Sequence, residues 1–150
     1  MGVALVVAVG GCGDDSSTGS QADDVPQAVI KLGSVPGLGK VLINSDNQTI
    51  YRSSLDIRTS GTTACNGPCA RVWQPVLTGP KPIAGPGGIE QFKLDTIKRQ
   101  DGTSQVTYDG WPLYTYTREG PRQSKGLGIS SFESGWYALQ GAKAISVEGK

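Results

Sequence analysis

The chain has 150 residues, of which 37% are hydrophobic, enough for one modest core and too few for two large ones. Glycine is abundant, with 22 residues, and charged residues make up only 18%, which favours short strands joined by turns over long exposed helices. Four of the 13 acids lie in residues 1–24, and the bases elsewhere are scattered singly apart from Lys98-Arg99, so no nucleic-acid partner is expected.

Residues 1–12 have the features of a lipoprotein-type signal peptide. The run from Val3 to Val9 is apolar and too short to span a bilayer, which takes about 20 apolar residues, but it has the length of the apolar region of a signal peptide. Small residues precede Cys12, as in the lipobox of bacterial lipoproteins, where cleavage before the cysteine is followed by diacylation of its thiol. We therefore expect an extracytoplasmic protein, anchored to the bacterial membrane by a lipidated Cys12. The alternative is an apolar terminus with an unmodified cysteine.

Residues 13–37 are interpreted as a flexible acidic tether and lead-in. The first part of this segment, 13–24, is polar and acidic and shows no apolar periodicity, as a tether between a membrane and a folded domain requires. The remaining residues, 38–150, are predicted to form a single β domain.

Aromatic, acidic and apolar residues of this domain recur at an offset of 63 positions. The pairs are Tyr51 and Tyr114, Trp73 and Trp136, Asp56 and Glu119, Asp46 and Asp109, Ile43 and Val106, Ile50 and Leu113, and Val76 and Leu139. Self-similarity at a fixed offset indicates a duplicated structural unit. We therefore predict two repeats, at about 38–79 and 100–142, with the first three pairs as their signature.

In the first repeat, short apolar segments alternate with turn residues. Residues 40–44 and 49–52 are predicted to form a hairpin around the turn 45–48. The stretch 78–88 is rich in glycine and proline and is interpreted as a linker between the repeats.

In the second repeat, Asp101-Gly102 and Asp109-Gly110 supply positive φ angles for two-residue turns, which predicts a three-strand meander over 92–117. Residues 134–140 form the last predicted strand. Because no window of 11 or more residues holds a helical apolar stripe, we predict an all-β fold. It consists of two tandem antiparallel β units with short hairpins and at most one short helix near Cys69.

Cys65 and Cys69 are predicted to form a disulfide. An exported chain meets an oxidising compartment, and the Gly67-Pro68 turn brings the two Cβ atoms within bonding range. A metal site and a redox-active dithiol remain as alternatives, although a redox pair usually has two intervening residues. The chain has no histidine and only one methionine, so neither a metal nor a cofactor is expected.

Three motifs carry a family resemblance. The chain resembles the bacterial secreted-repeat lipoproteins of unknown function in three segments. These are Tyr51 to Asp56, the Cys-x3-Cys-Ala-x-x-Trp segment from Cys65 to Trp73, and the segment from Asp101 to Tyr114 that ends in Gly-Trp-Pro-Leu-Tyr. The resemblance covers roughly residues 38–140. It departs at Gln74-Pro75, where the family has Pro-Pro, and at Glu119, where the family has Asp. The resemblance implies a lipid-anchored extracytoplasmic protein and implies no reaction.

The function that these features favour is a non-catalytic binding or envelope-organising module. Trp111 and Tyr116 have no aromatic counterpart in the first repeat, so they are the candidate binding surface for an envelope protein or a cell-wall glycan. The repeated tyrosines and tryptophans are expected in the core, with each tyrosine hydroxyl bonded to the acid of its own repeat.

Two other functions remain open. A wall-polymer hydrolase would use paired acids, for which Asp46, Asp56, Asp109 and Glu119 are the repeated candidates. A redox accessory would act through Cys65 and Cys69. Asp46 and Asp109 fall in predicted turns, where aspartate is favoured for backbone reasons, so we assign no catalytic residue and expect no enzyme.

Overall fold

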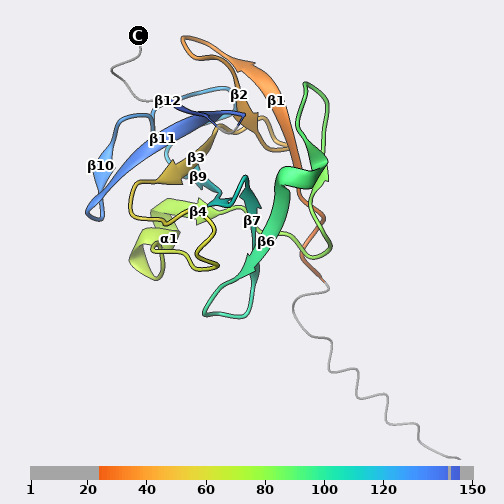
Figure 1. Cartoon of the computed structure of the whole chain (residues 1–150). Coiled ribbons are helices and arrows are strands. Elements are labelled where there is room, and N and C mark those ends of the chain that lie inside the picture. The colour runs from red at the N-terminus through yellow and green to blue at the C-terminus, as the bar shows by residue number, and fades with distance from the viewer. Residues whose placement is uncertain (1–23, 142, 146–150) are drawn as a thin grey trace, which may run out of the picture.

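The computed structural model describes residues 24–141 and 143–145 (Figure 1), so the predicted signal peptide with Cys12 and most of the acidic tether lie outside the described residues. The strands are β1 (Val29–Val35), β2 (Gly39–Ile43), β3 (Ile50–Ser53), β4 (Trp73–Pro75), β5 (Ile83–Ala84), β6 (Leu94–Lys98), β7 (Ser104–Tyr108), β8 (Trp111–Pro112), β9 (Tyr114–Tyr116), β10 (Ser130–Ser131), β11 (Ser134–Gln140) and β12 (Lys143–Ile145). One short helix, α1 (Pro68–Val72), and a 3-10 turn, η2 (Gln91–Lys93), complete the structure that is described. The predicted all-β class, with one short helix near Cys69, is confirmed. None of the helices in the described part is long and apolar enough to cross a membrane.

The central sheet has the strand order β10-β11-β3-β9-β4, with β12 paired to β11. Strands of the two predicted repeats alternate in it, because β3 and β4 come from the first and β9 to β11 from the second. The middle pair, β3 and β9, is antiparallel and sets Tyr51 opposite Tyr114. The halves of the chain are therefore interleaved rather than placed side by side.

Residues 63 positions apart occupy equivalent places in this sheet. Trp73 pairs with Tyr116 in the register of β4 and β9, and Trp136 pairs with Ser53 in the register of β11 and β3. The loops follow the same rule, since the backbone N–H of Thr59 donates to Gly110 O and that of Arg122 donates to Asn47 O. Thr59 and Arg122 both have positive φ angles, of 60° and 56°. The two halves thus share backbone geometry as well as sequence.

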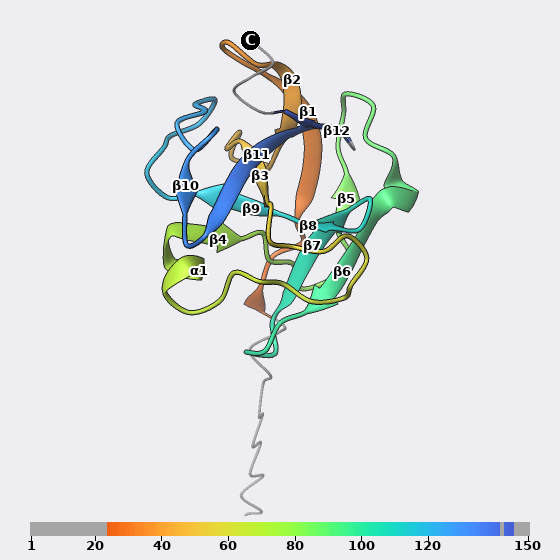
Figure 2. The same cartoon turned by 60° about the vertical axis from the view of Figure 1, so that its left-hand side comes forward.

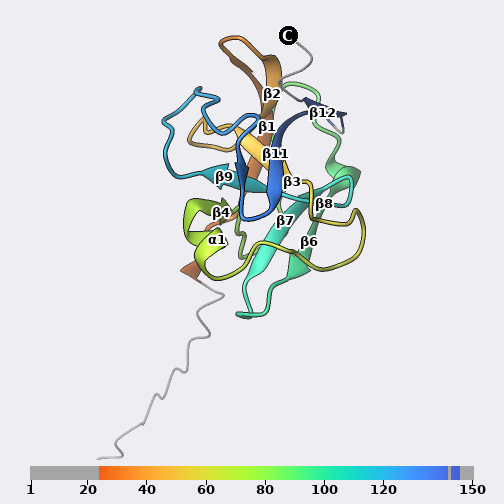
Figure 3. The same cartoon turned by 90° about the vertical axis from the view of Figure 1, so that its left-hand side faces the viewer.

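Two further sheets flank the central one, and Figure 3 shows the β1–β2 hairpin above the central strands and the β6–β7 hairpin below them. Successive residues of the central strands point to opposite faces and so enter two hydrophobic clusters. Tyr51 and Tyr114 join an aromatic cluster, whereas their neighbours Ile50 and Leu113 join an aliphatic one.

Four details differ from the sequence prediction. The lead-in within 13–37 contains a seven-residue strand, β1, because it pairs antiparallel with β2 and parallel with β5. Because β2 pairs with β1, the predicted hairpin of 40–44 with 49–52 is reduced to a single bridge between Ile43 and Thr49. The predicted linker 78–88 contains β5. At Asp101-Gly102 only the glycine has a positive φ angle, so this turn is longer than two residues, while Asp109-Gly110 has two positive φ angles, as expected.

Candidate functional site

The four repeated aromatic residues form the centre of the aromatic cluster. Trp73 and Trp136, from different repeats, stack with ring centroids 3.9 Å apart and planes inclined by 5°. Each indole also meets the edge of the tyrosine of its own repeat, at 5.4 Å for Tyr51 and 5.2 Å for Tyr114. All four side chains are fully buried. They stabilise the fold and are inaccessible to a ligand.

The repeated tyrosines find hydrogen-bond partners in the opposite repeats. The Tyr51 hydroxyl donates to Glu119 Oε2 at 2.9 Å, and the backbone N–H of Gly126 donates to the same oxygen at 3.1 Å. Asp56 Oδ1 accepts the backbone N–H of Ala64 at 2.7 Å, whereas the hydroxyl of Tyr114 forms its hydrogen bond with the hydroxyl of Thr63. The prediction that each hydroxyl meets the acid of its own repeat is therefore wrong. The antiparallel crossing of β3 and β9 carries each tyrosine into the other half.

Burial dominates the ionisation of these groups. It raises the pKa of both Asp56 and Glu119 above the usual range of a carboxyl. Burial and the adjacent carboxylates raise the pKa of Tyr51 and Tyr114 as well. Asp56 and Glu119 are only 5% and 8% exposed, so neither faces a cleft. Each carboxylate fixes its own loop, and the paired-acid arrangement of a hydrolase gains no support from them.

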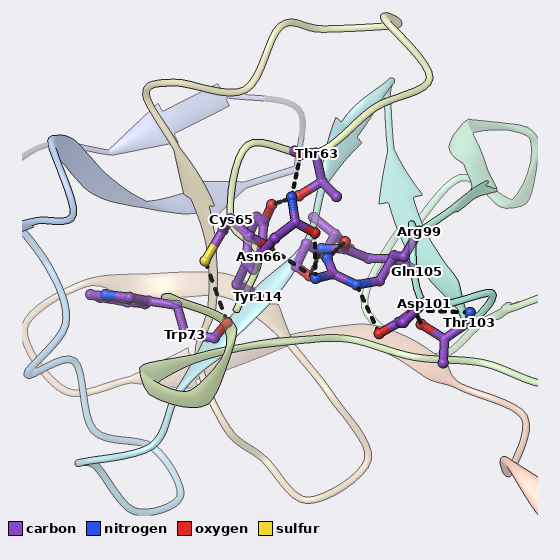
Figure 4. A network of polar contacts seen from close by, with 10 residues as sticks. Thr63, Cys65, Asn66, Trp73, Arg99, Asp101, Thr103, Gln105 and Tyr114 are labelled. Atoms are coloured by element: carbon purple, nitrogen blue, oxygen red, sulfur yellow. Dashed lines mark hydrogen bonds and ion pairs between the residues drawn. The ribbon is translucent and has the colours of Figure 1, made fainter. Parts of the chain in front are cut away.

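The predicted disulfide between Cys65 and Cys69 is confirmed, with both residues buried and their Cα atoms 5.3 Å apart. Arg99, the residue just before the second predicted repeat, holds the loop that contains this disulfide (Figure 4). Its guanidinium donates to Cys65 O at 2.9 Å, to Asn66 Oδ1 at 3.1 Å and to Gln105 Oε1 at 2.6 Å. Sequence reasoning missed this buried arginine. One signal was available: Gln105 is polar at a position where the first repeat has apolar Leu42.

Of the two residues predicted to form a binding surface, only one reaches the surface. Tyr116 is 8% exposed and stacks on Trp73 with ring centroids 4.4 Å apart, so its assignment to the surface is wrong. Trp111 is half-buried, and the Arg52 guanidinium carbon lies 4.1 Å from the centroid of its ring. The same guanidinium carbon lies 5.1 Å from the ring centroid of Tyr137. Trp111, Arg52 and Tyr137 thus form a cation–π cluster with the arginine between two rings, which we call the ladder.

A groove of about 460 Å³ lies on the outer face of the β6–β7–β8 sheet, and we call it the β6–β8 groove. The loop between β3 and α1 passes over this sheet (Figure 2) and contributes Arg58, Thr59 and Thr62 to one wall. Thr96 and Thr107 line it from β6 and β7.

Charged and aromatic side chains complete the β6–β8 groove. Asp109 is bound to Arg58, whose Nη2 lies 2.7 Å from Asp109 Oδ2. Asp95 is exposed on β6, and Lys93 forms an ion pair with Glu90 at the edge of the groove. Phe92 is 80% exposed beside them, and its ring centroid lies 5.8 Å from Lys93 Nζ. Sequence reasoning placed Phe92 at the start of a strand and so missed it. Phe92 lies in the 3-10 turn η2, and the pattern of apolar residues does not predict this turn.

The molecule is a β-repeat protein. Its two repeats interleave in one all-β domain around a buried aromatic cluster. Residues 95–140, from β6 to β11, match the model of the family described as a secreted repeat of unknown function. The resemblance drawn from the motifs is confirmed over these residues, and the family description supports an extracytoplasmic location. Comparison with curated proteins and with solved structures gives no match to the chain.

Proposed function

We propose that this protein is a lipid-anchored, non-catalytic binding module of the cell envelope, and that the β6–β8 groove binds cell-wall glycan. One observation carries the proposal: Phe92 is 80% exposed at the rim of a groove whose lining includes four threonines, two carboxylates and two basic side chains. Burial of an aromatic ring is the normal outcome of folding, so an exposed ring beside a polar groove is a feature to be explained.

The chemistry of the groove suits a sugar. The face of an aromatic ring packs against the C–H face of a pyranose, and hydroxyl and carboxylate groups exchange hydrogen bonds with the sugar hydroxyls. The volume of about 460 Å³ falls within the usual range for small-ligand pockets, roughly 300–1,000 Å³.

A hydrolase is the second candidate, because Asp95 and Asp109 both line the groove. A general acid works best as a carboxyl shielded from water. Asp95 is exposed and Asp109 is held by Arg58, so this requirement is not met. Binding without cleavage is the better reading of the same residues.

The test is titration of the full-length protein with soluble wall-glycan oligosaccharides, followed by calorimetry. Phe92→Ala should weaken binding about 3- to 10-fold, the loss expected for one aromatic contact. Phe132→Ala is the matched control, because Phe132 is also exposed, at 44%, and does not line the groove. Absence of binding, or equal effects of the two variants, contradicts the proposal. Release of shorter oligosaccharides that stops with Asp95→Asn would favour the hydrolase.

The lipid anchor is tested separately. The apolar run before Cys12 and the acidic segment after it support diacylation of the thiol. Mass spectrometry of the protein extracted from membranes should find the acyl groups on Cys12, and Cys12→Ala should release the protein from the membrane. An unmodified Cys12 on the membrane-bound protein would contradict the anchor.

A further inference from the structure

We propose that the ladder formed by Arg52, Trp111 and Tyr137 is an anion-binding site for the phosphate or carboxylate groups of an anionic cell-wall polymer. None of the three residues lines the β6–β8 groove, although Gly110 and Pro112, the neighbours of Trp111 in the chain, do.

The ladder is built on three strands. Arg52 lies on β3 directly opposite Tyr137 of β11, and Trp111 begins β8. The guanidinium carbon lies 4.1 Å and 5.1 Å from the two ring centroids, both within cation–π distance. Contact with two rings restrains the guanidinium without using its N–H groups, which point outward in its own plane.

Those N–H groups have no acceptor within residues 24–141 and 143–145, and no acid forms an ion pair with Arg52 there. Two other arginines of the same region are satisfied, whereas Arg71, Arg118 and Arg122 also lack a guanidinium partner there but are exposed to water. Arg58 binds Asp109, and Arg99 binds Gln105, Asn66 and Cys65 O. Arg52 is half-buried, and this burial lowers its pKa, although an arginine in water stays charged across the physiological range. A fixed, partly dehydrated cation with free donors is suited to hold an anion.

The fold does not require this ladder. The residues 63 positions from Arg52, Trp111 and Tyr137 are Thr115, Gln48 and Gln74. Gln74 pairs with Thr115 in the same register as Tyr137 with Arg52. In that half the equivalent place is an open hollow of about 400 Å³, lined by all three of these residues. Because polar side chains serve the same backbone equally well, the aromatic and cationic set in the other half needs a different explanation.

The geometry favours a polymer over a membrane surface. A planar guanidinium forms two parallel hydrogen bonds with one carboxylate or phosphate. Electrostatic attachment to a membrane uses clusters of about 4–8 basic residues, whereas the bases of this chain are scattered singly apart from Lys98-Arg99. One restrained arginine suits one anionic group of a flexible chain.

Nuclear magnetic resonance tests the site on the full-length protein, with inorganic phosphate and soluble poly(glycerol phosphate) as probes. We expect saturable shifts of the Arg52 Nε–H and Trp111 indole N–H signals. Arg52→Lys should weaken binding at least about tenfold, because an ammonium cannot form the bidentate pair. Arg52→Thr should abolish it, and threonine at the equivalent position 115 shows that such a strand accepts this residue. Arg118→Thr, which removes the same charge from an exposed position, should bind as the unchanged protein does.

The outcome separates this inference from the proposed function. Neutral wall oligosaccharides should bind to Arg52→Thr normally, and Phe92→Ala should bind phosphate normally. Trp111→Gln, which frees the guanidinium from one ring, should also weaken phosphate binding with the dispersed spectrum retained. The inference is overturned if both signals stay fixed with both probes, if Arg52→Thr and Arg118→Thr bind equally, or if only anionic lipid vesicles bind.

Discussion

The hydroxyl of Tyr51 and the carboxylate of Glu119 bind each other across the two repeats, and the hydroxyl of Tyr114 binds that of Thr63 in the first repeat. Each tyrosine hydroxyl therefore binds a side chain of the other repeat, while each acid holds a loop of its own repeat. The sequence predicts which residues are repeated, because identity at a fixed offset is visible in one dimension. It does not predict their partners, since partner choice depends on how the strands cross.

Glu119 makes stability depend on pH in an unusual direction. Burial raises the pKa of its carboxyl in the folded state above the unfolded value, so the folded chain holds the proton to higher pH. The stabilising effect of protonation is complete below the unfolded pKa and is lost as pH rises through the folded pKa. Lowering pH from neutrality should therefore increase the free energy of unfolding of the natural chain relative to Glu119→Gln. Urea unfolding of both proteins at several pH values measures the two free energies. A free energy of unfolding of the natural chain that falls relative to that of Glu119→Gln on acidification would contradict the prediction.

At the scale of elements, two hairpin turns with similar geometry differ in sequence. The turn between β7 and β8 uses Asp109-Gly110, with φ angles of 50° and 80°, and its residue types predict it. The turn between β10 and β11 uses Phe132 and Glu133, with φ angles of 53° and 60°. Nothing in these two residue types indicates such a turn. Tertiary contacts fix it instead, because the Ser134 hydroxyl lies 2.6 Å from that of Ser53 on β3.

Replacing this unfavourable turn should stabilise the protein. Positive φ angles are costly for phenylalanine and glutamate and are tolerated by asparagine and glycine. Phe132→Asn with Glu133→Gly should raise the free energy of unfolding by about 0.5–2 kcal/mol. Phe132 is 44% exposed, so little buried area is lost. Urea midpoints provide the measurement, with each single replacement measured beside the double variant. A lower midpoint for the double variant would show that Phe132 contributes packing that outweighs the backbone strain.

At the scale of the whole molecule, the sequence predicts the class of fold and the repeats but not that the strands of the two repeats interleave. The all-β class, the short helix and the disulfide follow from local patterns, and they are found. β1 was missed because its order comes from β2 and β5 rather than from its own residues. Tyr116 was assigned to the surface because the equivalent residue of the first repeat is Ser53, which is not aromatic. In the structure Tyr116 is buried against Trp73 of the other half. Absence of a counterpart marks a difference between the repeats and says nothing about exposure.

Interleaving predicts that neither half folds alone. In the central sheet β3 lies between β11 and β9, and β9 lies between β3 and β4, so the middle strand of each half has both its neighbours in the other half. Separate fragments 24–79 and 80–150 should therefore give no cooperative thermal unfolding. Mixing them should restore it, together with the near-ultraviolet dichroism of the Trp73–Trp136 stack, whose two indoles come from different fragments. The full-length protein is the reference for both signals. Cooperative unfolding of either fragment by itself would mean that a repeat can complete its own core, and the alternation of strands would then be incidental to stability.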